Sequence, residues 1–220
     1  MDDIQVKDLT HCCETATPRK SRLQSLVWIH RIGTTCGRSV PQIARFFIEG
    51  EGARATGGNM AYHYVVLPDC VQQALPLDEQ GAHARRWGNA HGIGVAILGD
   101  FNYDRPTQQQ WTMAASLTAD LVGLLRGHSY EVWDLLPSHL RRGIPVVGHG
   151  EVPGTFSPSA GKEQPGGRYA CPGRHWDMRT FRADVERELL RRAVVRCDRL
   201  GHSLTREGGV RAPASDGRRS

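Results

Sequence analysis

The sequence of 220 residues has no apolar run that approaches the ~20 residues required for a membrane-spanning helix. Its N-terminus, MDDIQ, is acidic and polar with no apolar stretch behind it, so we expect no secretory signal and synthesis in the cytoplasm. The hydrophobic share of 39% and the charged share of 23% are ordinary for a globular protein. We therefore expect a single domain with a substantial buried core.

The sequence also lacks two familiar metal-binding patterns. It contains no Cys-x-x-Cys pair and no His-Glu-x-x-His motif, which argues against a zinc finger and against a zincin. The cysteines are Cys12, Cys13, Cys36, Cys70, Cys171 and Cys197. Their spacings suggest no disulfide framework for a chain of this size. We expect all of them to be reduced, with Cys171 as the one that bears function.

The net charge of +5 is not gathered in any obvious motif. A basic protein is attracted to polyanions, and nucleic acid is one such partner. The arginines are scattered, however, and no basic helix or strand with interleaved aromatic residues stands out. We interpret the charge as a solvated basic surface and expect neither nucleic acid nor a membrane as a partner. A nucleic-acid-binding protein is kept as a remote hypothesis, which predicts binding that weakens steeply with salt.

Short apolar segments alternate with helical patterns along the chain. Residues 25–29, 62–67, 93–98 and 145–147 are predicted strands, and 71–75 is the expected hairpin partner of the second. The segment 93–98 is a continuous apolar run between glycines, which is typical of a central strand. The alternation predicts an α/β fold.

Three helices are expected after residues with capping ability. Ser39 with Gln42, and Thr107 with Gln110, fit the capping box, in which each side chain accepts from a backbone N–H of the other residue. Asp177 precedes the last helical stripe, and a shorter helix is expected within 130–140.

The composition divides the chain into three parts. Residues 1–22 are polar and patternless, and we expect a loosely docked N-terminal arm. The folded domain is expected to span residues 23–200. Residues 201–220 are rich in Ser, Gly, Arg and Pro, and are expected to be a disordered basic tail. Within the domain, residues 153–169 contain repeated proline and glycine and are a predicted loop.

Two histidines and a cysteine stand in separate, recognisable contexts. His30 ends the apolar segment VWIH, His149 lies in GHGE, and Cys171 lies in ACPG. Two imidazoles and one thiolate form a three-ligand zinc site with a fourth position open to water, as catalytic zinc sites have. Taken singly, a histidine at the end of an apolar strand is more often a packed residue, and a single cysteine is more often a small buried apolar group.

Five pieces of the sequence, from Leu26 to about Phe181, resemble the type 2 N-acetylmuramoyl-L-alanine amidase family in the family's own order. That family includes phage lysozyme-like amidases and peptidoglycan recognition proteins. The matching pieces are 27–30 (VWIH), 61–66 (AYHYVV), 81–84 with 92–101 (GAHA and GIGVAILGDF), 148–152 (GHGEV) and 170–173 (ACPG).

The resemblance implies a single domain with a central mixed β-sheet flanked by helices. It implies zinc held by His30, His149 and Cys171, and hydrolysis of the amide bond between N-acetylmuramic acid and L-alanine of peptidoglycan. Tyr62 matches the family's catalytic tyrosine and is expected to stabilise the oxyanion, although a strand tyrosine that only packs on the sheet is the alternative.

The resemblance also places further residues near the substrate. His83 lies where the family contacts substrate, and Arg85, Trp87 and Asn89 are expected to form a polar and aromatic rim; a surface role for His83 is the alternative. Tyr169 stands where the phage branch has a lysine, so Tyr169, or the neighbouring Arg168, is expected to assist at the oxyanion. Ala96 stands where some members have a glutamate.

A peptidoglycan- or muropeptide-binding module without turnover is the alternative function. Non-catalytic relatives commonly replace the cysteine ligand, so the presence of Cys171 favours the enzyme. The expected partner is peptidoglycan or a muropeptide, and the chain is expected to be a monomer. A phage or prophage endolysin that reaches the wall after release, a muropeptide-recycling enzyme and a secreted toxin all fit the sequence.

Overall fold

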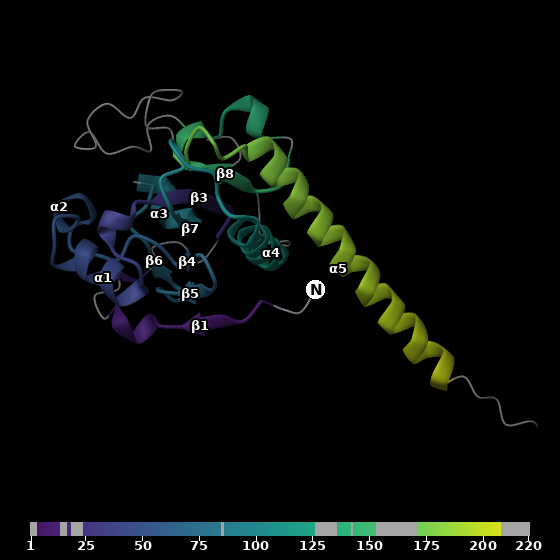
Figure 1. The fold of residues 1–220 in the computed structure, drawn as a ribbon. Coiled ribbons are helices and arrows are strands. Elements are labelled where there is room, and N and C mark those ends of the chain that lie inside the picture. Colours follow the sequence, from purple (N-terminus) through teal and green to yellow (C-terminus); the bar gives the residue numbers. More distant parts are fainter. Residues whose placement is uncertain are drawn as a thin grey trace, which may run out of the picture.

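The computed structural model describes residues 4–13, 17–18, 24–84, 86–125, 136–141, 143–152 and 171–207. A mixed six-stranded sheet with helices on both faces forms the domain, as the sequence predicted (Figure 1). In spatial order its strands are β1 (Val6–Asp8), β5 (Val71–Gln73), β4 (Tyr64–Val66), β7 (Gly92–Leu98), β3 (Leu26–Ile32) and β8 (Val146–Gly148). A separate two-stranded pair joins β2 (Thr17–Pro18) to β6 (Glu79–Gln80).

The two longest strands, β3 and β7, lie side by side in the middle of the sheet. They pair in parallel, and β4 and β8 flank them, also in parallel. Every residue of β7 is buried, as expected for a strand covered on both faces. The register places His30 beside Ala96, which in turn lies beside Val65. These three side chains therefore share one face of the sheet.

The hairpin of β4 and β5 is antiparallel, as predicted, although both strands are shorter than their apolar segments. Tyr62 precedes β4 and is not part of the ladder.

The N-terminal segment is part of the sheet, which corrects the expectation of a loosely docked arm. Val6–Asp8 pairs in parallel with Val71–Gln73 and forms the edge strand. All three of its side chains are exposed, so its attachment depends on backbone hydrogen bonds. Because such a strand has no buried side, its sequence shows no alternation of apolar and polar residues from which it could be predicted.

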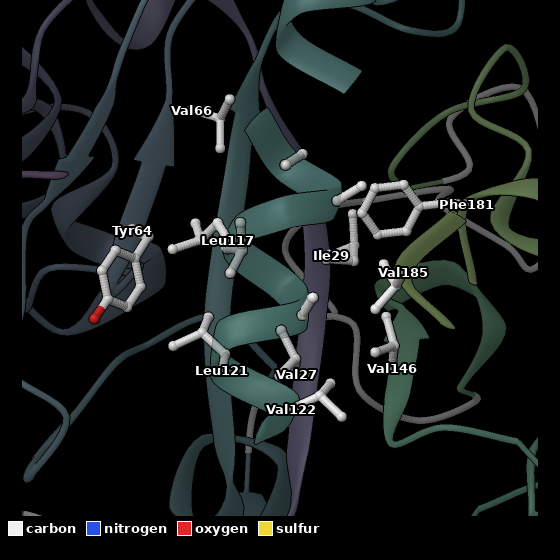
Figure 2. Close-up of a cluster of buried hydrophobic side chains, with 14 of the residues drawn as sticks. Val27, Ile29, Tyr64, Val66, Leu117, Leu121, Val122, Val146, Phe181 and Val185 are labelled. Atoms are coloured by element: carbon white, nitrogen blue, oxygen red, sulfur yellow. The ribbon is translucent and has the colours of Figure 1, made fainter. Parts of the chain in front are cut away.

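One face of the sheet packs on α4 (Gln108–Leu125) and the first part of α5 (Met178–Glu207). Figure 2 shows Leu117 and Leu121 of α4 and Phe181 of α5 against strand side chains such as Ile29 (Figure 2). The predicted capping box is present at the start of α4. Thr107 N–H donates to Gln110 Oε1 (3.2 Å), and Gln110 N–H donates to Thr107 Oγ1 (3.1 Å).

The opposite face packs on α1 (Val40–Ile48), near the short helix α2 (Ala53–Thr56). The helix begins where Ser39 predicted, but no side-chain cap bond forms there. Gln42 Oε1 instead accepts the backbone N–H of Arg38 at 2.8 Å. The short helix α3 (Arg86–His91) precedes β7.

The C-terminal helix α5 is the longest element. Asp177 caps it, as predicted, by accepting the backbone N–H groups of Arg179 (2.9 Å) and Thr180 (3.3 Å). The helix continues past Gly201 to Glu207, where we expected disorder, because one glycine costs a helix only about 1 kcal/mol relative to alanine. The helix expected within 130–140 falls partly outside the described residues; the described part forms a single 3-10 turn, Ser138–Leu140.

Candidate metal centre and active site

His30 lies at the centre of the site. Its side chain is 1% exposed, on the sheet face that also carries Ala96. Its ring centroid lies 4.7 Å from that of His149, 5.1 Å from that of His83 and 5.2 Å from that of Tyr62. The structure thus brings together four residues that the sequence analysis assigned to the site.

The two predicted histidine ligands and the predicted cysteine ligand have the geometry of a metal site. One ligand atom from each of His30, His149 and Cys171 lies within 4.8 Å of the others. The Sγ of Cys171 is 3.9 Å from the Nδ1 of His30. Sulfur and nitrogen ligands of one tetrahedral zinc ion lie about 3.5 Å apart, given the usual bond lengths. The donor set and its spacing therefore fit zinc closely.

The environment of His30 favours the neutral imidazole that metal binding requires. Burial lowers its pKa well below the usual value of 6.5, and the neighbouring His149 and His83 lower it further. A neutral imidazole has a lone pair available for a metal ion. The Nδ1 atom faces Cys171, and the Nε2 atom faces Nδ1 of His83 at 3.2 Å. Nδ1 is therefore the atom of His30 that is placed to meet a metal ion.

The segments that carry His149 and Cys171 are tied to each other. The N–H of Gly150 donates to the carbonyl of Cys171 at 2.6 Å. A side chain at Gly150 would bring its Cβ to 2.8 Å from that carbonyl oxygen, so the close approach requires glycine. The two ligands are therefore held at a fixed separation, although 22 positions separate them in the sequence.

Glu151 fixes the turn that carries His149. Its Oε2 accepts the N–H of Gly148 at 2.7 Å, and its two oxygens accept from the guanidinium of Arg182 at 2.7 and 2.9 Å. This bidentate pair joins the turn to α5. Its partner Arg182 is a residue that the sequence analysis did not identify.

The turn after Cys171 is anchored to the segment that follows β7. Gly173 has a φ of 133°, and a Cβ there would lie 2.5 Å from the backbone of Phe101, so only glycine fits. His175 N–H donates to the carbonyl of Phe101 at 2.8 Å. Trp176 is buried, with its ring 5.3 Å from that of Phe101.

His83 is placed against His30 and not on a surface. It is 7% exposed, and Gly94 on β7 leaves room for it, because a Cβ at Gly94 would lie 2.8 Å from the ring. Asn89 holds the segment in place, since its Oδ1 accepts the backbone N–H groups of His83 (2.9 Å) and Ala84 (2.6 Å). Asn89 therefore shapes the backbone beside the site through its carbonyl oxygen.

The aromatic residues of the site differ in their surroundings. Tyr62 is half-buried, and its ring also contacts that of Phe47 at 5.6 Å. Trp87 is half-buried and packs on Trp28 at 5.6 Å. The ring of Trp28 lies 6.1 Å from that of His149, so this fully buried residue supports the site from the strand interior.

His63 binds backbone groups through both of its ring nitrogens. Its Nδ1 accepts the N–H of Gly94 at 2.9 Å, and its Nε2 lies 3.1 Å from the carbonyl of Glu79, to which it donates. Three predicted site residues, Arg85, Arg168 and Tyr169, lie outside the described residues, as does the loop 153–169.

Among the described residues, no helix is both long and apolar enough to cross a bilayer. A search of curated proteins gives no match.

Solved structures share the fold at low sequence identity. An N-acetylmuramoyl-L-alanine amidase endolysin, LysCS, from Clostridium intestinale is 19% identical, with a TM-score of 0.56, over 83% of this chain and 95% of that one. The Ph2119 endolysin of a Thermus scotoductus bacteriophage is 17% identical, with a TM-score of 0.54, over 82% and 99%. A mutant of Drosophila PGRP-LB in complex with tracheal cytotoxin is 15% identical, with a TM-score of 0.52, over 79% and 91%.

A family model described as N-acetylmuramoyl-L-alanine amidase matches residues 20–174. The match includes β3, β7, the turn at His149 and the cysteine of the site. The chain belongs to the N-acetylmuramoyl-L-alanine amidase family and is a peptidoglycan amidase.

Proposed function

We propose that this amidase cleaves the bond between N-acetylmuramic acid and L-alanine with a zinc ion held by His30, His149 and Cys171. The observation that carries the proposal is the placement of three suitable ligand atoms within 4.8 Å of one another. When bound in such a site, zinc polarises the amide carbonyl and lowers the pKa of water toward ~7.

Tyr62 is proposed to act on the substrate carbonyl. A phenol O–H is a hydrogen-bond donor, and donors aimed at a carbonyl oxygen stabilise the negative charge that develops there during attack. The ring of Tyr62 is 5.2 Å from that of His30 and only half-buried, which suits a group that meets a substrate.

His83 is proposed to orient His30. With Nε2–H of His30 donating to Nδ1 of His83, the lone pair of His30 is left on Nδ1, which faces Cys171. Groups that hold a metal ligand in one tautomer and one orientation strengthen metal binding. Asn89 supports this arrangement through the backbone of His83.

The remaining predicted residues are proposed to surround the substrate. Trp87 packs on Trp28 of β3, the strand that carries His30, and so offers an aromatic surface next to that strand. Arg85 is proposed for the same rim. Tyr169 and Arg168 lie two and three positions before Cys171 in the sequence, so either can supply a second donor near the carbonyl.

The biological setting that we propose is degradation of cell-wall peptidoglycan, as in an endolysin. Support comes from the similarity to the two endolysins and from the presence of the complete ligand set. A module that binds peptidoglycan without cutting it has no need of a cysteine at position 171.

Digestion of purified peptidoglycan tests the proposal. The chain is incubated with the wall material alone, after treatment with a chelator, and after zinc is restored, and the fragments are identified by mass spectrometry. Stem peptides with a new L-alanine N-terminus, lost on chelation and regained with zinc, are expected. The Cys171→Ser variant should be inactive, whereas Cys70→Ser, the same change at a half-buried cysteine elsewhere, should retain activity. Retention on the wall without fragments would instead identify a binding module.

A further inference from the structure

Apolar residues of α5 lie on one side of the helix up to Leu189 and on the opposite side from Leu190 onward. Phe181, Val185 and Leu189 recur at intervals of four and are buried in the core. Leu190 and Val194 are 68% and 59% exposed. At 100° per residue, Leu190 lies about 180° around the helix from Phe181. These exposed apolar side chains therefore face away from the domain that the helix packs against.

The sequence continues the exposed apolar stripe along the helix. Counting from Leu190, the apolar or small residues Val194, Cys197, Gly201 and Leu204 follow at four, seven, eleven and fourteen positions, the spacing of one helix face. The arginines of this part of α5 lie at least about 100° away from Leu190 by the same count. They are Arg191, Arg192, Arg196, Arg199 and Arg206. The sequence beyond Glu188 therefore describes a basic amphipathic helix.

The net charge of the protein belongs entirely to this end of the chain. Residues 1–190 contain 20 basic (Lys and Arg) and 20 acidic (Asp and Glu) residues, whereas residues 191–220 contain 8 basic and 3 acidic ones. The difference of five equals the whole net charge. Five of these eight basic residues fall within α5, together with the acidic Asp198 and Glu207, so a net charge of +3 belongs to one helix segment, 191–207.

Near residues 188–192, the helix α5 is held to the rest of the domain by ion pairs and hydrogen bonds. Arg192 donates to Asp120 and Ser116 of α4, and Arg191 and Arg192 both pair with Glu188. Figure 1 shows the C-terminal part of α5 running beyond the other elements (Figure 1). The helix is thus anchored to the domain up to Arg192.

We propose that α5 from Leu190 onward binds an anionic lipid surface. The apolar stripe enters the boundary between headgroups and acyl chains, and the arginines beyond Arg192 meet the negative headgroups. A second copy of the chain would match the apolar stripe but would bring two positively charged helices together. A nucleic acid or an anionic wall polymer would match the charge but would leave the apolar stripe in water. This proposal replaces the expectation that the protein has no membrane partner, and it does not depend on the zinc chemistry.

Flotation of the full-length protein with lipid vesicles tests the proposal. The protein should float with vesicles of phosphatidylcholine and phosphatidylglycerol, and much less with phosphatidylcholine alone. The variant R196Q/R199Q/R206Q should bind the anionic vesicles about 100-fold more weakly, at roughly fivefold for each arginine near a charged surface. The matched variant R38Q/R54Q/R105Q, which removes the same charge from exposed sites elsewhere, should bind like the wild type.

The variant L190S/V194S separates a lipid surface from other partners. It keeps all the arginines and changes two exposed side chains, so its circular dichroism should match that of the wild type, while its vesicle binding should fall. The proposal is overturned if the wild type does not float with anionic vesicles, or if both arginine variants lose the same amount of binding. It is also overturned if L190S/V194S binds vesicles normally, which would indicate a polyanion site, or if light scattering shows a dimer that this variant abolishes.

Discussion

Replacing His83 with alanine should weaken zinc binding without removing any of the three proposed ligands. The change deletes the nitrogen that faces Nε2 of His30 at 3.2 Å, so His30 is no longer confined to the tautomer with its lone pair on Nδ1. Loss of such a supporting partner typically costs 10- to 100-fold in metal affinity, or about 1.4–2.7 kcal/mol. Competition for zinc with a fluorescent chelator measures the loss directly.

The matched control for this change is His175→Ala, the same substitution at an exposed histidine close to Cys171 in the sequence. Its zinc affinity should equal that of the wild type. Thermal unfolding of both apo-proteins shows whether the cavity left at buried His83 has disturbed the fold. If His83→Ala binds zinc as tightly as the wild type but needs more peptidoglycan to reach half its maximal rate, the residue contacts substrate, and the reasoning from its hydrogen bond to His30 is refuted.

Two substitutions and one chemical modification test other parts of the account. Tyr62→Phe should lower kcat by about 10²- to 10³-fold and leave zinc affinity unchanged, as expected for loss of an oxyanion donor; a normal kcat in steady-state assays would exclude that role. Phe181→Ala should lower the free energy of unfolding by about 3–5 kcal/mol in denaturant titrations, because a fully buried ring is removed from the core; a loss below 1 kcal/mol would contradict its anchoring role. Burial raises the pKa of the Cys13 thiol to about 12, so alkylation of the native protein near pH 8 should leave Cys13 unmodified by mass spectrometry, whereas modification before unfolding would show that the N-terminal segment is not docked.

The sequence predicted the central strands well because their signal is local. The run 93–98 is apolar throughout and bounded by glycines, and it forms β7 with every side chain buried. The capping box of Thr107 and Gln110 is equally local, and both of its hydrogen bonds form. Ser39 and Gln42 have the same spacing, yet Gln42 binds the N–H of Arg38 instead. Spacing therefore located both helices but did not determine the bonds at their first turns.

The features that sequence analysis missed depend on contacts between distant segments. The strand Val6–Asp8 is recruited by the backbone of β5 and has no apolar side of its own. Arg182 has no local sequence signal, because its pairing with Glu151 depends on how α5 packs in the fold. His83 was associated with the cleft through a resemblance, but its contact with His30 depends on how a loop folds over β7. Glycine, serine and arginine in the C-terminal part suggested disorder, yet the helix continues to Glu207.

The proposed metal ligands were predicted partly from local motifs and depend partly on contacts between distant segments. Their motifs in sequence order suggested His30, His149 and Cys171, but no spacing rule could place two segments 22 residues apart against one strand. The hydrogen bond from Gly150 to Cys171 and the pair of Glu151 with Arg182 provide that placement. The ligand set therefore follows from the fold as much as from the motifs.

X-ray absorption spectroscopy of the zinc-loaded protein tests the central claim most directly. The account predicts one sulfur ligand at about 2.3 Å and two imidazole nitrogens at about 2.0–2.1 Å, with the fourth position filled by a light atom. In Cys171→Ser the sulfur contribution should disappear, and in Cys70→Ser it should remain. A zinc shell without sulfur in the wild type, or with sulfur that persists in Cys171→Ser, would contradict the assignment of this metal centre.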